Sequence, residues 1–226
     1  MIVAIDGPAG AGKSSVARAL AARLEFRYLD TGAMYRIVTL AVLDAGIDPT
    51  DELSVAELLP RLSFDSPINP GRQQHRLSGR DVTGEIRGPQ VTLAVTPVSA
   101  NPAVRGYLLG RQRQLAGSGR MVVEGRDIGT VVVPDATLKI YLTADATERA
   151  RRRHQQNVGA AARSGGTATD LAEVALDLNR RDTKDSTRAH SPLQAAPDAV
   201  VIDSSELEVD ETVARVLTLA TERGIR

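Results

Sequence analysis

Residues 1–15 read MIVAIDGPAGAGKSS, and this stretch decides the fold. The apolar run at 2–5 carries no charge and is typical of a strand buried on both faces. Residues 7–14 then fit the pattern G-x-x-x-x-G-K-[ST], and apolar residues recur at helical spacing over 16–24. A strand, a glycine-rich loop and a helix in this order predict a loop that binds the phosphates of a nucleoside triphosphate.

The residue types of the loop suit that chemistry. Glycines let several backbone N–H groups turn toward one anion, and the start of the helix adds partial positive charge. Lys13 supplies a cation for the β- and γ-phosphates, and the Ser14 hydroxyl is a ligand for Mg²⁺. The alternative is a glycine-rich turn that only caps a helix. The candidate nucleotide-binding residues are Gly7, Pro8, Ala9, Gly10, Ala11, Gly12, Lys13, Ser14 and Ser15.

Composition excludes several classes of protein. The 226 residues have a formal net charge of zero, no cysteine and no tryptophan. A thiolate metal site and a disulfide framework are therefore excluded, and nucleic acid is not an expected partner. No apolar run approaches the roughly 20 residues of a membrane span. We expect a cytoplasmic monomer that contacts neither nucleic acid nor membrane.

Strands alternate with helices along the chain. Further strands are predicted at 26–29, 121–123, 138–142 and 199–202. With the first strand they predict an α/β fold, a five-stranded parallel sheet with helices on both faces. Helices are predicted to begin at Asn101-Pro102 and to span 34–42, 52–62 and 170–189.

Two segments interrupt this pattern. Residues 63–88 are rich in proline, glycine, asparagine and arginine, which favours a small β-rich insertion. Its arginines fit either a solvated face, which we favour, or the lining of a site: Arg72, Arg76, Arg80 and Arg87. Residues 157–169 are mostly alanine, glycine, serine and threonine and predict a mobile flap.

Polar residues follow the predicted strands at the edge where ligands gather in parallel sheets. Asp30, Thr31 and Arg36 follow the second strand, and Arg126-Asp127 follows the third. An arginine there is suited to fork onto a phosphate. The alternatives are a helix cap with a surface arginine, and an ordinary surface ion pair. Glu124, at the end of the third strand, is a candidate for holding Mg²⁺ through a water.

Arg181, Asp185 and Arg188 stand at helical positions i, i+4 and i+7, hence on one face. They fit a clamp for a phosphate and a ribose, or equally a salt-bridged solvent face. Asp182 and Lys184 are expected to point elsewhere.

A basic run lies beside the predicted flap and contains Arg149, Arg151, Arg152 and Arg153. Such arginines on a closing flap would neutralise phosphate charge and exclude water. The alternative is an RNA-binding helix, which the zero net charge disfavours. The three histidines lack partners at metal-ligand spacing.

The chain resembles the bacterial cytidylate kinases. The matching segments are IDGPAGAGKSS (5–15), YLDTGAMYR (28–36), GEIR (84–87), VEGRDIGTVV (123–132), ERARRR (148–153) and RRDTKDSTRAHSPL (180–193). The resemblance implies a nucleoside monophosphate kinase that transfers the γ-phosphate of ATP, with Mg²⁺, to CMP or dCMP. It also implies that 63–88 is the insertion over the monophosphate and about 149–169 the lid over ATP.

The resemblance carries roles for individual residues. On the donor side it adds Arg152 of the lid to the loop residues. The positions it assigns to the acceptor are Thr31, Arg36, Thr96, Arg105, Arg126, Asp127, Arg181, Asp185 and Arg188. The residues that would share the transfer step are Lys13, Arg126, Arg153 and Arg181. Two positions depart from the family pattern: Thr96 stands in place of serine, and Ser15 in place of threonine.

Besides a nucleic-acid-binding protein, which the zero net charge disfavours, two other functions stay open at this point. One is a kinase for another small acceptor, such as UMP, AMP or a dephospho-cofactor. The other is a nucleotide-hydrolysing switch, although the chain has no Asn-Lys-x-Asp guanine motif.

Overall fold

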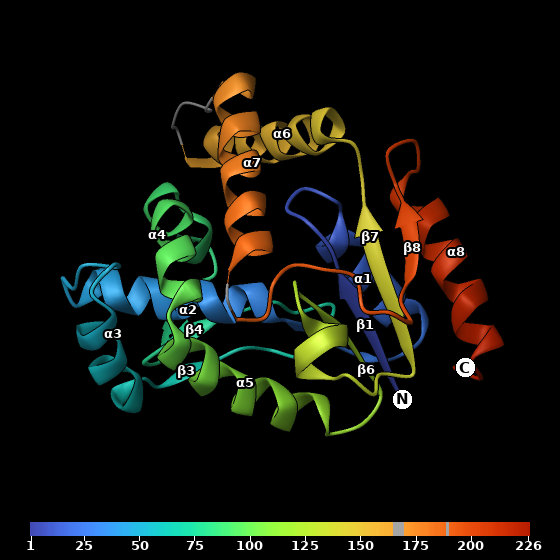
Figure 1. Cartoon of the computed structure of the whole chain (residues 1–226), viewed down its shortest axis with the longest axis horizontal. Coiled ribbons are helices and arrows are strands. Elements are labelled where there is room, and N and C mark those ends of the chain that lie inside the picture. The colour runs from blue at the N-terminus through green and yellow to red at the C-terminus, as the bar shows by residue number, and fades with distance from the viewer. Residues whose placement is uncertain (165–169, 189) are drawn as a thin grey trace.

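The computed structural model of the 226-residue chain describes residues 1–164, 170–188 and 190–226 (Figure 1). Its strands form a five-stranded sheet in the order β2-β6-β1-β7-β8 and a small three-stranded sheet in the order β3-β4-β5. Within the described ranges, no helix is both long and apolar enough to cross a lipid bilayer.

The large sheet is parallel throughout, which confirms the predicted fold class. Its strands are β1 (Ile2–Asp6), β2 (Arg27–Asp30), β6 (Met121–Glu124), β7 (Leu138–Thr143) and β8 (Val200–Asp203). In the register, Glu124 lies opposite both Ile5 and Asp30. The carboxyl ends of β1, β2 and β6 are therefore level, and the polar residues that follow them meet at one edge.

Helices cover both faces of this sheet. The helices of the described residues are α1 (Lys13–Arg23), α2 (Thr31–Asp44), α3 (Glu52–Leu58), α4 (Pro89–Ala100), α5 (Pro102–Ala116), α6 (Ala146–Ser164), α7 (Leu171–Thr187) and α8 (Val209–Glu222). Alternate side chains of β1 enter different cores, as the two-residue period of a strand requires. Val3 and Ile5 pack with α1 and α8, whereas Ala4 packs with α2 and α5.

The insertion at 63–88 holds the small sheet. It contains β3 (Phe64–Asp65), β4 (Arg76–Leu77), β5 (Arg80–Asp81) and a 3₁₀ turn, η2 (Glu85–Arg87). Leu77 and Ile86 are buried in a cluster with Ile37 and Leu40 of α2. The insertion is therefore anchored on the helix that follows β2.

Helix α6 lies above the carboxyl edge of the sheet, and α7 crosses it and packs against it (Figure 1). Ala150, Val174 and Leu178 form a small separate core between them. The composition of 157–169 predicted a flap, but the residues as far as Ser164 continue α6. Three consecutive alanines at 160–162 favour the helix. Residues 165–169 and 189 lie outside the described residues, and movement of the lid stays a prediction.

Several elements differ from the prediction. The helix predicted over 52–62 ends at Leu58 and continues as a 3₁₀ turn, η1 (Leu59–Arg61), which contains Pro60. Helices α4 and α8 were not predicted. The predicted start of α5 is confirmed, since the Asn101 side chain accepts a hydrogen bond from the backbone N–H of Ala103 at 2.9 Å.

Candidate active site

The glycine loop between β1 and α1 fits closely against its neighbours. At Gly7 (φ 146°) a Cβ atom would lie 1.9 Å from the carbonyl oxygen of Leu142 on β7. At Gly10 (φ 79°) it would lie 2.8 Å from the carbonyl oxygen of Arg149 on α6. Side chains at these positions are excluded by space and by backbone angle. The loop therefore presents bare backbone at the start of α1, as an anion site requires.

Lys13 opens α1 and crosses the loop. Its Nζ donates to the carbonyl oxygen of Pro8 at 2.6 Å. Desolvation and the neighbouring Arg126 lower the pKa of Lys13, while Glu124 opposes that shift. The ammonium group is thus held at the loop among other charges.

One cavity of about 1160 Å³ joins the predicted residues. Ala9–Ser15 line one end of it, with Arg152 of α6 close to Gly12. Arg36 of α2, Arg153 of α6 and Arg181 of α7 line the other end. Every residue predicted for the site lines it except Gly7 and Pro8. Those two contribute backbone oxygens, to Arg126 and Lys13 respectively.

Ser14 and Glu124 are the predicted Mg²⁺ residues, and they are in contact. The Ser14 Oγ donates to Glu124 Oε2 at 3.0 Å, and the Tyr28 hydroxyl donates to Glu124 Oε1. Burial and nearby Asp30 raise the pKa of Glu124. Hydroxyl and carboxylate oxygens are ligands that Mg²⁺ accepts, and Mg²⁺ retains waters beside nucleotide phosphates. In the described part of the chain no group of three or more His, Cys, Asp or Glu residues is arranged to hold a metal. The pair therefore fits Mg²⁺ that arrives with phosphate oxygens as further ligands.

Four arginines face one another at the far end of the cavity: Arg36, Arg87, Arg153 and Arg181. Desolvation and the charges of Arg181, Arg153 and Arg87 lower the pKa of Arg36 to about 9. Desolvation and Arg181 also lower the pKa of Arg153. Arg36, Arg153 and Arg181 are desolvated, whereas 54% of the Arg87 side chain is exposed. Like charges gathered in this way form a site for an anion with several oxygens.

Other groups hold these arginines in place. Arg36 Nη1 donates to the carbonyl oxygen of Ile86 and to Thr92 Oγ1, both at 3.0 Å. Arg87 Nη2 lies 3.2 Å from Asp30 Oδ2. Asp30 also caps α2 by accepting from the backbone N–H of Ala33. The cap is thus Asp30 and not Thr31, whose hydroxyl donates to the carbonyl oxygen of Glu124 at 2.7 Å.

Arg126 connects the two ends of the cavity. Its Nη1 donates to the carbonyl oxygen of Gly7 at 2.6 Å, and its Nε donates to Asp185 Oδ2 at 2.9 Å. Asp185 also lies 3.5 Å from Arg188 Nη1. The face of α7 that carries Asp185 is thus turned toward the loop and not toward solvent.

Arg105 and Asp127 form a buried ion pair on the side of the cavity lined by Thr96. The guanidinium carbon of Arg105 lies 5.6 Å from the centre of the Tyr35 ring. Thr96 belongs to α4, and this helix continues through Pro97. Thr96 therefore still lines the cavity. A paired carboxylate and guanidinium suit a base edge that carries both donors and acceptors.

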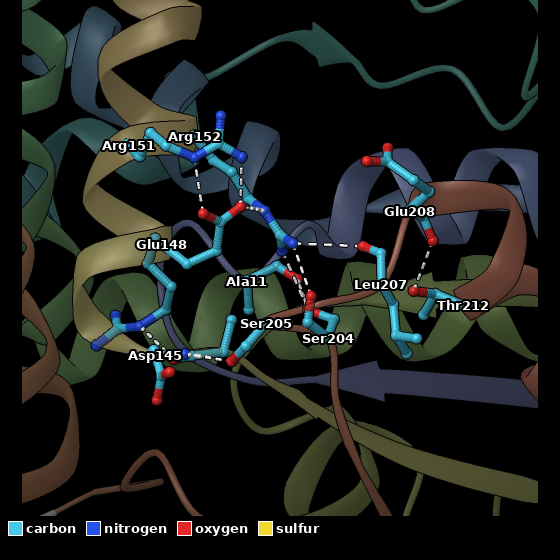
Figure 2. A network of polar contacts seen from close by, with 12 residues as sticks. Ala11, Asp145, Glu148, Arg151, Arg152, Ser204, Ser205, Leu207, Glu208 and Thr212 are labelled. Atoms are coloured by element: carbon cyan, nitrogen blue, oxygen red, sulfur yellow. Dashed lines mark hydrogen bonds and ion pairs between the residues drawn. The ribbon is translucent and has the colours of Figure 1, made fainter.

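The basic run on α6 separates into different roles. Arg149 bonds to Asp182 of α7 and to the carbonyl oxygen of Ala9. Figure 2 shows Arg152 bonded to Glu148 and reaching the turn after β8, where its Nη2 donates to the Ser204 carbonyl oxygen at 2.6 Å. Arg153 joins the arginine cluster instead. Only part of the run therefore contacts the region of the glycine loop.

Two residues of the site, Asp182 and Tyr28, were missed from sequence, and both interpretations of a third, Arg87, hold. Asp182 was expected to point elsewhere, but its Oδ1 accepts from the backbone N–H of Ala9 at 3.1 Å. That contact joins residues 173 positions apart, so no local pattern announces it. Arg87 has 54% of its side chain exposed, as the favoured solvated face predicts, and it also lines the cavity, which was the alternative. Its place in the segment GEIR was the available signal. Tyr28 lies inside β2, where an aromatic residue indicates only a core position.

Comparison with known proteins identifies relatives of the whole chain. The family model for cytidylate kinase matches residues 3–222. The cytidylate kinase of Rhodococcus jostii (strain RHA1) is 53% identical over 224 residues, which cover 99% of this chain and 96% of that protein. That of Mycolicibacterium paratuberculosis is 53% identical over 225 residues, with 99% and 96% covered. That of Limosilactobacillus reuteri (strain DSM 20016) is 48% identical, with 95% and 92% covered.

A solved structure matches the fold alone. It is an uncharacterised protein from Eubacterium ventriosum, with a TM-score of 0.51 and 12% identity over 98% of each chain. The sequence relatives and the family model, by contrast, span nearly the full length at high identity. This chain belongs to the cytidylate kinase family.

Proposed function

We propose that the chain transfers the γ-phosphate of ATP to CMP or dCMP and yields ADP with CDP or dCDP. Its place in the cytidylate kinase family supports ATP as donor and CMP as acceptor. The observation that carries the proposal is one cavity that has the glycine loop at one end and four arginines at the other. Two anions brought together in that space would have their reacting groups between Lys13 and Arg181.

On the donor side, the backbone of residues 7–15 binds the ATP phosphates. Lys13 leaves the carbonyl oxygen of Pro8 and pairs with the β- and γ-phosphates. Mg²⁺, held by Ser14 and through a water by Glu124, would supply charge neutralisation at these phosphates. Arg152 covers the nucleotide from the lid.

On the acceptor side, Arg36 and Arg181 hold the monophosphate and Asp185 holds the sugar. Arg105, Asp127, Thr96 and Arg188 read or support the reading of cytosine. The ion pair of Arg105 and Asp127 supports that role, because it lies in the cavity next to the monophosphate cluster.

The chemical step is a direct in-line displacement. An oxygen of the CMP phosphate forms a bond to the γ-phosphorus, and the bond from that phosphorus to the bridging oxygen of ADP breaks. The attacking oxygen is already ionised near neutral pH, so no strong base is needed. Positioning and charge stabilisation by Lys13, Arg126, Arg153 and Arg181 perform the catalysis.

A panel of acceptors tests the proposal. The protein with ATP and Mg²⁺ is assayed against CMP, dCMP, UMP, AMP and a dephospho-cofactor, with ADP formation as the readout. CMP and dCMP are expected to be the best acceptors, with slow ATP hydrolysis when none is present. A better acceptor outside this pair overturns the base assignment, and fast hydrolysis without acceptor favours a switch. We expect a cytoplasmic monomer, and sedimentation tests the oligomeric state.

A further inference from the structure

Tyr28 lies on β2 in a mainly apolar position. Its side chain is 1% exposed and packs in the core that β1 and α1 share. Tyr28 is nevertheless among the residues that line the large cavity, and its hydroxyl donates to Glu124 Oε1. A buried tyrosine places its hydroxyl donor at a fixed point, because its ring is held by the packing of the core.

Glu124 needs such a fixed donor. It is 3% exposed, and its register partner on β2 is Asp30, a second buried carboxylate. Its two side-chain hydrogen bonds use different oxygens: Tyr28 occupies Oε1 and Ser14 occupies Oε2. When the Ser14 hydroxyl turns to a metal, Tyr28 is the remaining one of these two donors.

From this geometry we propose that Tyr28 is a positioning residue for the donor metal. Its hydroxyl holds the Glu124 carboxylate with Oε2 toward Ser14, so that Glu124 meets a water of the nucleotide-bound Mg²⁺ in one orientation. The proposal rests on the function proposed above, because it requires that Mg²⁺ enters with the nucleotide at Ser14. Tyr28 itself touches neither nucleotide nor metal.

The Tyr28→Phe variant tests this role through binding. ADP binding is measured by calorimetry in EDTA and along a Mg²⁺ titration. In EDTA the variant is expected to bind ADP within twofold of the wild type. Mg²⁺ is expected to increase the affinity for ADP. The Mg²⁺ midpoint, the concentration at which half of this increase is reached, is expected to rise about tenfold in the variant, as the loss of one hydrogen bond to a charged group implies. Turnover is expected to recover at high Mg²⁺.

Tyr107→Phe is the matched control. The Tyr107 hydroxyl contacts the carbonyl oxygen of Leu62 and Arg111, away from the loop. Its removal should leave the Mg²⁺ midpoint unchanged. Glu124→Gln should shift the midpoint by itself, and adding Tyr28→Phe to it should add little, because the two residues act as one unit.

Two results would overturn the proposal. One is an unchanged Mg²⁺ midpoint in Tyr28→Phe, and the other is weakening of ADP binding by equal factors with and without Mg²⁺, which indicates a structural role alone. If Tyr28→Phe does not fold, Glu124→Gln still tests the proposal. An unshifted Mg²⁺ midpoint in Glu124→Gln would mean that Glu124 does not help to bind the metal, and Tyr28 could then not act through it. If the wild type shows no Mg²⁺-dependent ADP binding, the proposed function itself fails.

Discussion

The two ends of the cavity are built in different ways. The donor end is one continuous stretch, Ala9–Ser15, whose conformation is fixed by glycines and by the start of α1. The acceptor end gathers arginines from α2, η2, α6 and α7, which are up to 145 residues apart (181 − 36). Backbone N–H groups at the donor end attract an anion without repelling one another, whereas the arginines repel each other until an anion joins them. Changes at the donor end should therefore act mainly on rate. Changes at the acceptor end should act on acceptor affinity and on stability as well as on the rate.

The largest expected effect is at the donor end. Lys13→Ala removes the cation closest to the transferred phosphate and should lower kcat by about 10³-fold. CMP affinity, measured by calorimetry, should change less than threefold. Lys184→Ala, an exposed lysine on α7, is the charge-matched control and should behave as the wild type. Normal turnover in Lys13→Ala would remove Lys13 from the mechanism.

Arg181 tests the acceptor end. The nearest carboxylate to its guanidinium, Asp177 Oδ2, is 3.9 Å away, and desolvation and Arg126 lower the pKa of Arg181. Arg181→Met should raise KM for CMP by about 10²-fold without lowering the Tm of the nucleotide-free protein. CMP should stabilise the wild type more than the variant, because a ligand stabilises only the state that binds it. A lower Tm with normal KM would make Arg181 a structural residue.

The same contrast explains what the sequence predicts well. The loop and the parallel sheet follow from local patterns: apolar runs, glycine spacing and a lysine at the start of a helix. The arrangement of the acceptor residues depends on tertiary packing. Resemblance to a family indicated which residues to expect, but not that Asp185 binds Arg126 or that Arg126 reaches Gly7.

The errors have the same origin. Helical spacing alone does not show which carboxylates of α7 face the site, because the neighbour that meets each one comes from another element. Asp182 meets Ala9 of the loop, and Arg87 meets Asp30 of β2. Helix α4 was not predicted. It contains Pro97, which lies near its end, so the proline ring interrupts only one hydrogen bond there. Composition at 157–164 likewise gave no sign of the packing with α7 that supports α6.

A smaller effect is expected at Asp185, which belongs to both ends. It supports Arg126 and is proposed to bind the sugar of the acceptor. Asp185→Ala should weaken turnover with both acceptors, because Arg126 loses its partner. The additional loss for CMP relative to dCMP should be about tenfold, the contribution of one charge-assisted hydrogen bond. Measured as kcat/KM for each acceptor, equal losses would mean that Asp185 does not read the 2′-hydroxyl.

The smallest expected effect concerns Asp6, which ties the two ends together. Its carboxylate accepts from the backbone N–H groups of Ile128 and Gly129, both at 2.8 Å, in the π-helical turn η3 (Ile128–Val132) that follows Asp127. Asp6→Asn keeps one of these bonds and places an amide donor against the other N–H. The turn should loosen slightly, and KM for CMP should rise about threefold while ADP affinity is unchanged. An unchanged KM for CMP would mean that the conformation of η3 does not affect binding of the acceptor.

The pH dependence of stability gives a second measure of the same carboxylate. Burial raises the pKa of Asp6 to about 6, with Asp127 adding to the shift and Lys13 opposing it. Because the folded pKa lies above the ordinary value of 3.8, the folded protein binds a proton that the unfolded chain releases. This contribution to the free energy of unfolding is present below about pH 4 and is lost as the pH rises through about 6.

Urea unfolding measures this loss. The free energy of unfolding of Asp6→Asn should therefore decline less between about pH 4 and 6 than that of the wild type. Asp135→Asn, at an exposed position, should keep the wild-type slope. Equal slopes in all three proteins would mean that Asp6 is already ionised across this range and that the tie between the two ends is a charged one.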